Sequence, residues 1–596
     1  MVDWLRAGVN LPLLLACLLF AGYTLGFGNP YSFYVMAIAG CYALLVIGFQ
    51  FIFGHAGAVS LAQSAFFGIG AYVSGLLGIT LGWGFQYTFP LAILLPTLIS
   101  VVVAIPVLKL EEHYFALATL GLGLVALLIA TQWVSLTGGM NGLAGVPNFM
   151  LFGFEAKSRL DKLIFIWVIV GIGALLAYQI MRGLYGLEFR IARENSTAAM
   201  SVGINVSVLR FAAFVLSASY AGGAGALFAH QIKVVSPQNL EFSVMITCLT
   251  MTVVGGRTSV IGGIIAAVIL IHLPEWFRVL QDYRLLAFGA AALLMVVIAP
   301  EGIVGALLTF RQRLFPEQPP RLPAARLRPV RQPNGAADNA PLLSIEGLAK
   351  SFGGVRAIKE VNLGLKPGEI FGLIGPNGSG KTTLLNLISG IYLPDRGRVL
   401  FAGEDVTKAP AYAISRLGLG RTFQNINLVG DMTALDNVAV ARANITDTTL
   451  WNALTAFGRD RALEYAREHA MSLLQVVGAA DIAGQRCDSL PYGLKRRVEI
   501  ARALAVEPRL LLLDEPAAGL NEAEQVELSA RLKQMTRDGL TLLVIEHNMR
   551  FLLPLAERMS CLDDGEIIAH GTPEEIVADP AVIEAFLGAP EDEEVA

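Results

Sequence analysis

The sequence contains a glycine-rich loop whose spacing is typical of phosphate binding. It follows the pattern G-x-x-x-x-G-K-[ST] and consists of Gly375, Pro376, Asn377, Gly378, Ser379, Gly380, Lys381 and Thr382. Glycines there let backbone N–H groups approach phosphate oxygens, Lys381 reaches the terminal phosphates as a point charge, and the Thr382 hydroxyl is a ligand for Mg²⁺. The loop predicts a nucleotide site, to which we also assign Thr383.

Two apolar runs further along the chain end in residues that could complete the chemistry of this site. Leu510–Leu513 precedes Asp514 and Glu515, and Leu542–Ile545 precedes Glu546 and His547. We expect Asp514 to organise Mg²⁺ and Glu515 to polarise an attacking water. His547 is a candidate contact for the γ-phosphate, although a single histidine at a strand end is more often structural.

An α/β nucleotide-binding domain is expected to position these residues. A strand-like run, Glu369–Ile374, leads into the loop, and a helix-like run, Thr383–Ile388, leads out of it. Strand-like and helix-like runs alternate from Leu342 to about Leu587, as in such a domain. The sequence therefore predicts an α/β P-loop domain over residues 342–587.

The first half of the chain is far more apolar than the second. Of the 596 residues 55% are hydrophobic and only 15% are charged, and the apolar excess lies before about residue 310. Runs of spanning or near-spanning length are Leu11–Phe27, Tyr31–Phe53, Ser64–Leu81, Pro90–Leu108, Tyr114–Leu136 and Leu163–Met181. Residues 1–310 are predicted to form an all-α transmembrane domain, so that one polypeptide joins ATP binding to a membrane.

A basic segment sets the expected topology. Arg182, Arg190, Arg193 and Arg210 mark a loop that the positive-inside rule places in the cytoplasm, with the amino terminus on the same side. Four more helices follow, of which the middle two are short or form a re-entrant pair broken at Gly255-Gly256-Arg257. They are Val208–His230, Ser243–Val254, Val260–Leu273 and Leu285–Leu308. The total is about ten helices.

The remaining segments differ in composition. Residues 311–341 are rich in Arg and Pro and are expected to form a cytoplasmic tether whose arginines can also lie on anionic lipid heads of the bilayer. Residues 588–596 form an acidic tail. The net charge of −4 gives no support for nucleic-acid binding.

At these motifs the second half resembles the ATPase of an ABC transporter. The resemblance implies that Gln424 senses Mg²⁺ and faces the permease, and that Phe352 stacks on adenine. Pro491 stands where the signature motif has a serine, so the expected hydroxyl contact to the γ-phosphate is missing. The Gly493 N–H and the N-terminus of a helix beginning near Lys495 could still bind phosphate.

A second departure is Asn521, where the cassette's D-loop usually has Asp, and both departures resemble the ATPases of hydrophobic amino-acid importers. In the first half, residues 53–72, 136–143 and 300–305 resemble a permease of the branched-chain amino-acid importers. The basic loop holds a match to the permease coupling pattern Glu-Ala-Ala-x-x-x-Gly, with Thr for Glu. The matching residues are Thr197, Ala198, Ala199 and Gly203.

Residues 53–72 also interrupt an apolar region with small and polar residues. Close helix packing explains the glycines. For His55 and Gln63 two interpretations stay open, packing or a substrate path, because irregular backbone at membrane depth is tolerated beside protein or water.

The chain is thus identified as a permease fused to its ATPase, within an ATP-driven importer of branched-chain or related hydrophobic amino acids. The resemblance implies a second permease and a second cassette, as different subunits more than as a second copy, and a periplasmic substrate-binding protein. It also implies the bacterial cytoplasmic membrane. The alternatives are importers of urea, short amides or aromatic acids, a homodimeric exporter or flippase, and a membrane-anchored regulatory ATPase.

Overall fold

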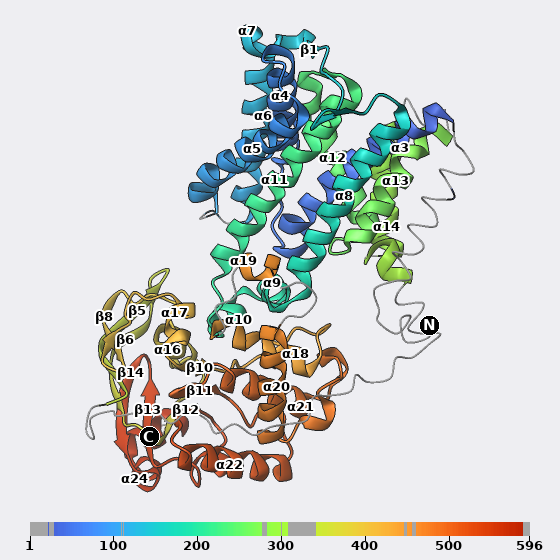
Figure 1. Ribbon diagram of the computed structural model, residues 1–596. Coiled ribbons are helices and arrows are strands. Elements are labelled where there is room, and N and C mark those ends of the chain that lie inside the picture. The colour runs from blue at the N-terminus through green and yellow to red at the C-terminus, as the bar shows by residue number, and fades with distance from the viewer. Residues whose placement is uncertain are drawn as a thin grey trace, which may run out of the picture. The chain divides into compact units, whose positions relative to one another are not determined.

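The computed structural model describes residues 22, 29–108, 110, 112–276, 283–299, 301–307, 341–445, 450–455 and 461–587. The chain divides into two compact units (Figure 1). Unit 1 comprises Met1–Arg182 and Ser207–Gln318, and unit 2 comprises Gly183–Val206 and Pro319–Ala596. The expected segment Leu11–Phe27, apart from residue 22, the tether before residue 341 and the acidic tail lie outside the described residues.

Unit 1 is helical. Its main helices are α3 (Pro30–Phe49), α4 (Gln63–Thr80), α5 (Phe85–Val107), α6 (Glu112–Gln132), α8 (Arg159–Arg182), α11 (Val206–Ile232), α12 (Phe242–Gly255), α13 (Val260–Trp276) and α14 (Arg284–Ile298). The helix α3 packs against both α8 and α13 (Figure 1). Short strands β1 (Leu143–Ala144) and β4 (Val234–Val235) pair antiparallel.

The apolar runs predicted from the sequence form helices wherever the structure describes them, but the expected total of about ten spans is not confirmed. Six helices of the described residues are long and apolar enough to cross a membrane, and α12 and α13 are shorter. The two short helices expected around Gly255-Gly256-Arg257 are present as α12 and α13.

Helix α3 does not continue directly into α4. It passes into a π-helical turn, η1 (Gln50–His55), and non-helical backbone follows before α4 begins. The Gln50 Nε2 atom donates to the carbonyls of Gly256 at 3.0 Å and Ser259 at 2.8 Å, which lie between α12 and α13. A Cβ at Gly54 would lie 1.8 Å from the Arg257 carbonyl oxygen. Close backbone packing therefore fixes this interruption.

Unit 2 is built on a ten-stranded sheet of the described residues. Its strand order is β10-β11-β12-β7-β13-β14-β6-β5-β8-β9. The bounds are β5 (Leu343–Phe352), β6 (Val355–Leu365), β7 (Ile370–Ile374), β8 (Arg396–Phe401), β9 (Glu404–Asp405), β10 (Leu419–Arg421), β11 (Leu510–Asp514), β12 (Thr541–Ile545), β13 (Arg558–Asp563) and β14 (Glu566–Gly571). Strands β10 to β13 with β7 pair in parallel, so their carboxyl ends meet at one edge.

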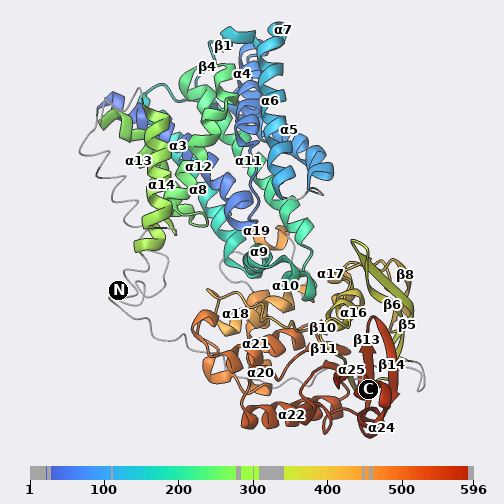
Figure 2. The same ribbon diagram turned by 180° about the vertical axis from the view of Figure 1, so that it is seen from behind.

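The main helices of unit 2 are α16 (Lys381–Ile388), α17 (Ala411–Arg416), α18 (Ala434–Ala439), η5 (Val440–Asn444), α20 (Arg461–Val476), α21 (Tyr492–Leu504) and α22 (Glu522–Arg537). In Figure 2, α18, α20 and α21 lie at the end of unit 2 away from β5, β6 and β8, whereas α16 and α17 lie beside those strands. Helices α18, α20 and α21 pack on one another.

Unit 2 also contains a segment that lies between two apolar helices in the sequence. This segment forms α9 (Leu184–Glu194) and α10 (Ser196–Ser201), and it packs against α17 and η5. The predicted coupling residues therefore belong to the same compact unit as the P-loop.

Candidate active site

The P-loop lies between the buried strand β7 and helix α16. Gly375 and Gly380 adopt φ values of +153° and +104°. A Cβ at Gly375 would lie 2.0 Å from the Leu562 carbonyl oxygen, and one at Gly380 would lie 2.5 Å from that of Ala357. Both positions require glycine, because conformation and contact distance exclude a side chain.

Lys381 is the first residue of α16 and curls over the loop. Its Nζ atom donates to the carbonyls of Gly375 at 2.8 Å and Pro376 at 2.7 Å. Burial lowers the pKa of Lys381, whereas the charges of Glu515 and Asp514 raise it. Partial desolvation strengthens the attraction of this ammonium for a phosphate.

The carboxyl end of β11 brings Asp514 and Glu515 beside the loop. Asp514 is 2% exposed, and burial raises its pKa while the charge of Arg421 lowers it. Its backbone N–H donates to Thr422 Oγ1 at 3.3 Å. Glu515 follows with φ of +48°, a left-handed conformation that costs energy for a residue with a Cβ and often marks a functional position.

His547 lies close to Glu515, as the two strand ends predict. Its Nδ1 atom is 3.5 Å from Glu515 Oε1, and the histidine side chain is 63% exposed whereas that of Glu515 is 18% exposed. This places an exposed imidazole and a sheltered carboxylate at the same edge of the sheet as the P-loop.

Two other predicted residues of the nucleotide site are exposed. Gln424 follows β10, and Phe352 ends β5 with 41% of its surface exposed. The ring of Tyr392 packs edge-on against Phe352, with centroids 5.2 Å apart, and Lys350 Nζ lies 5.4 Å from the same ring. The sequence did not indicate that Tyr392 lies beside Phe352, because this contact depends on the packing of β5 against a loop forty residues later.

The signature helix begins earlier than expected. The sequence predicts a start near Lys495, but α21 starts at Tyr492, with Pro491 as the N-cap residue at φ −57° and ψ 154°. Proline fixes φ and needs no N–H partner, so it is well suited to a helix start. Gly493 therefore lies in the first turn, where its N–H has no acceptor within the helix.

Asn521 has a structural role that the sequence did not indicate. It is the N-cap of α22, where its side-chain Oδ1 accepts from the Glu524 N–H at 2.9 Å. In return, the Glu524 carboxylate accepts from the backbone N–H of Asn521 at 3.0 Å. An aspartate makes the same reciprocal capping box, so Asn is compatible with this position.

The predicted coupling residues contact helix α17 within unit 2. Ala198 and Ala199 are fully buried. The Ser415 hydroxyl donates to the carbonyl of Ser201 at 2.8 Å, and Arg416 Nε donates to that of Gly203 at 3.1 Å. Carbonyls at the end of α10 are thus bound by two side chains from α17.

The two residues considered for a substrate path differ in their surroundings. Gln63 is 1% exposed, and it donates to the Leu45 carbonyl at 3.2 Å and accepts from the Ser217 hydroxyl at 2.7 Å. His55 is half-buried, with its ring 6.3 Å from that of Phe51. Gln63 thus joins three helices by hydrogen bonds.

Comparisons with known proteins cover both units. A family model described as branched-chain amino acid transport system / permease component matches residues 31–299. The model described as ABC transporter matches residues 358–518, and that described as branched-chain amino acid ATP-binding cassette transporter matches residues 566–592.

Curated relatives match the second half over almost their full length. The high-affinity branched-chain amino acid transport ATP-binding protein LivG of Escherichia coli is 41% identical over 42% of this chain and 98% of its own. BraF of Pseudomonas aeruginosa, with the same description, is 38% identical over 42% and 98%. A solved nucleotide-free ATP-binding cassette is 29% identical over 42% of this chain and all of its own, with a TM-score of 0.38.

The permease model and the ATPase relatives agree on one transport system. The P-loop and the strand-end carboxylates lie in the part that matches LivG, and the apolar helices lie in the part that matches the permease. Unit 1 is therefore membrane-embedded, and unit 2 carries a cytoplasmic ATPase that binds and hydrolyses ATP to drive transport. The chain belongs to the branched-chain amino-acid family of ABC transporters, with its permease and its ATP-binding cassette joined in one polypeptide.

Proposed function

We propose that this chain imports branched-chain or related hydrophobic amino acids across the bacterial cytoplasmic membrane, using ATP hydrolysis in its own cassette. The observation that carries the proposal is that a branched-chain permease and a LivG-like ATPase occur in one polypeptide. We propose that residues 1–310 form the bilayer domain, with about ten helices. Residues 342–587 are proposed to form the ATPase domain.

In the ATPase, the chain's own residues hold and orient the nucleotide. The P-loop from Gly375 to Thr383 and the Gly493 N–H bind phosphates, and Phe352 stacks on adenine. Glu515 polarises the attacking water, while His547 contacts the γ-phosphate. The desolvated Lys381 supplies a fixed positive charge to the terminal phosphates.

The residues around the P-loop suit Mg²⁺. The Thr382 hydroxyl, the Asp514 carboxylate and the Gln424 amide are hard oxygen donors, which Mg²⁺ prefers. The buried Asp514 carboxyl has a raised pKa, and a cation beside it would favour the charged form. The ion would neutralise charge on the phosphates when bound.

The segment from Thr197 to Gly203, with Ala198 and Ala199, carries motion of the ATPase to the membrane helices. The contacts from Ser415 and Arg416 support this proposal. ATP acts through its different affinity for the open and closed states of the ATPase, and the coupling segment transmits that difference.

A complete transporter needs additional subunits. A cassette of this family binds ATP between its own P-loop and the signature helix of a second cassette, so we propose a second permease and a second ATPase, as different subunits. A periplasmic binding protein would deliver the amino acid. Isolating the tagged chain from its native membranes and sequencing everything that copurifies tests this composition. Recovery of two copies alone, still hydrolysing ATP, would contradict it.

Uptake of labelled leucine by cells that depend on this chain tests the import function. The variant Glu515→Gln should bind ATP but abolish uptake, because the uncharged amide cannot polarise water. The matched control Glu404→Gln changes an exposed carboxylate on β9 and should import normally. Uptake of urea or of an aromatic acid in place of leucine would reassign the substrate. Efflux would point to an exporter, and ATP hydrolysis without any flux to a regulatory ATPase.

A further inference from the structure

Three charged residues on α21 are buried inside unit 2, although residues of these types are rarely buried. Arg496, Glu499 and Arg502 are 1%, 0% and 1% exposed, and their three-residue spacing places them on one side of the helix. Removing one member of such a cluster would leave a buried charge without its partner. Exposure to solvent therefore cannot account for these three charges, and their role must come from the groups that they contact inside the unit.

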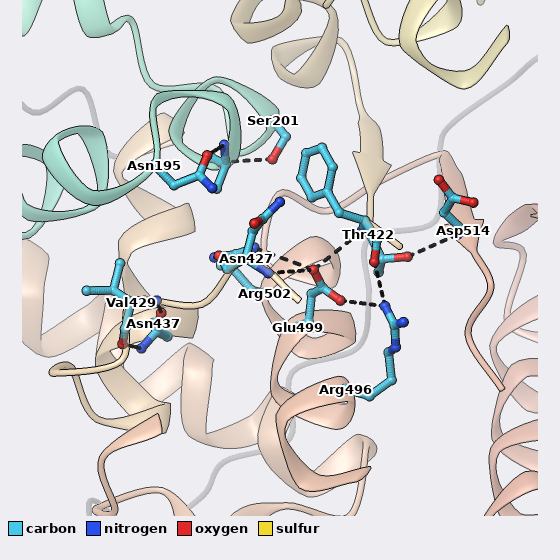
Figure 3. A network of polar contacts seen from close by, with 12 residues as sticks. Asn195, Ser201, Thr422, Asn427, Val429, Asn437, Arg496, Glu499, Arg502 and Asp514 are labelled. Atoms are coloured by element: carbon cyan, nitrogen blue, oxygen red, sulfur yellow. Dashed lines mark hydrogen bonds and ion pairs between the residues drawn. The ribbon is translucent and has the colours of Figure 1, made fainter. Parts of the chain in front are cut away.

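Glu499 and Arg502 bind both ends of the segment that carries Gln424. The Glu499 carboxylate accepts from the N–H groups of Phe423 and Asn427, each at 3.4 Å. Arg502 Nη1 donates to the Asn427 carbonyl at 2.6 Å. Figure 3 shows Glu499 between Arg496 and this backbone. Hydrogen bonds from the signature helix α21 thus hold the backbone of the Gln424 segment at both ends.

Arg496 extends these contacts to the backbone of Glu515. Its Nη1 atom donates to the Phe423 carbonyl at 2.7 Å and to Glu499 at 2.8 Å. Its Nη2 atom donates to the carbonyls of Gln424 at 3.1 Å and Glu515 at 3.3 Å. A planar guanidinium presents five donors in a fixed fork over three nitrogens, whereas the ammonium of lysine carries three donors on a single nitrogen and cannot span the same acceptors.

We propose that Arg496 and Glu499 are positioning residues, which fix the backbone of Gln424 and Glu515 relative to the first turns of the signature helix. A shift of that helix then moves both residues together. This proposal rests on the roles assigned to Gln424 and Glu515 under the proposed function, but not on the identity of the transported solute.

The test compares two conservative substitutions of buried arginines. Arg496→Lys keeps the charge beside Glu499 but removes the fork that reaches Gln424 and Glu515. Arg442→Lys is the matched control, because Arg442 is likewise buried, at 2% exposed, and is paired at 2.8 Å with a different carboxylate, Glu507. Both variants are made in the full-length chain, isolated with its partner subunits. Thermal unfolding, ATP KM and ATPase kcat are measured.

We expect both variants to lower the unfolding temperature, whereas only Arg496→Lys should lower kcat, by about tenfold or more, with KM for ATP changed less than about threefold. Misplacing reacting groups reduces turnover without removing nucleotide contacts. Glu499→Gln, which keeps the side-chain shape, should also lower kcat. It provides a second test of the proposal if Arg496→Lys does not fold.

A kcat for Arg496→Lys and Glu499→Gln equal to that of Arg442→Lys would overturn the proposal, as would a KM increase with kcat unchanged. The variant Glu515→Gln separates this failure from that of the underlying assignment. If Glu515→Gln still turns over ATP, the catalytic role of Glu515 is wrong and the positioning role is lost with it. If Glu515→Gln does not turn over ATP, the kcat of Arg496→Lys tests the positioning role alone.

Discussion

Asn437 in α18 holds a buried turn, and its replacement gives a prediction with a calculable size. Asn437 is 0% exposed, and its Oδ1 accepts from the Val429 N–H at 2.9 Å. Its Nδ2 donates to the carbonyls of Val429 at 3.0 Å and Thr433 at 3.1 Å. These contacts appear in part in Figure 3. The turn includes Asp431, which pairs with Arg190 of α9.

Asn437→Ala removes these three hydrogen bonds, together with longer Nδ2 contacts to the Met432 carbonyl at 3.5 Å and to Cys487 Sγ at 3.3 Å. At about 1 kcal/mol for each, the closed turn loses about 3 kcal/mol relative to its open form. Because about 1.4 kcal/mol corresponds to tenfold in an equilibrium constant, the population of the open turn rises by about a hundredfold. Asn437→Asp should be at least as harmful, since a carboxylate oxygen would then face the two carbonyls that the amide now binds.

Hydrogen–deuterium exchange of the full-length chain measures this opening. Amides of the turn should exchange about a hundredfold faster in Asn437→Ala, whereas β5 should be unchanged, because exchange reports local opening free energy. The control Asn362→Ala removes a single bond from an exposed side chain to Gly347 and should change exchange by less than about tenfold. Wild-type exchange in both Asn437 variants would refute the assignment of the turn to these bonds.

Three further changes have expected outcomes in unit 2. Gly375→Ala should abolish ATP binding, measured by fluorescent-nucleotide titration, because its Cβ would meet the Leu562 carbonyl at 2.0 Å; tight binding would contradict this. Asn521→Ala should destabilise α22 by about 1 kcal/mol, seen as faster amide exchange, and Asn521→Asp should not, since only Ala breaks the capping box with Glu524. Burial lowers the pKa of His570, so below about pH 6.5 the unfolded chain binds more protons than the folded chain, and the free energy of unfolding decreases as the pH is lowered. His570→Asn should reduce this pH dependence of the free energy of unfolding, and an unchanged slope would count against the imidazole as its source.

Several features followed from the sequence because they depend on neighbouring residues. The spacing of the glycines and Lys381 specified the P-loop, and the apolar runs before Asp514 and His547 indicated buried parallel strands. Long apolar runs likewise predicted helices, because a spanning segment must satisfy its backbone hydrogen bonds within itself. The short helices α12 and α13 were predicted from the same kind of local pattern, and the structure confirms them.

Other features depended on the tertiary structure, because their partners lie far away in the sequence. Arg496 and Glu499 have the composition of a solvated helix face, and only packing against a segment about seventy residues earlier buries them. The start of α21 at Tyr492 depended on the backbone angles of Pro491. The contact of Ser415 with Ser201 spans 214 residues. Local sequence fixes which elements form, whereas burial and hydrogen bonding between distant segments decide which of their polar side chains act together.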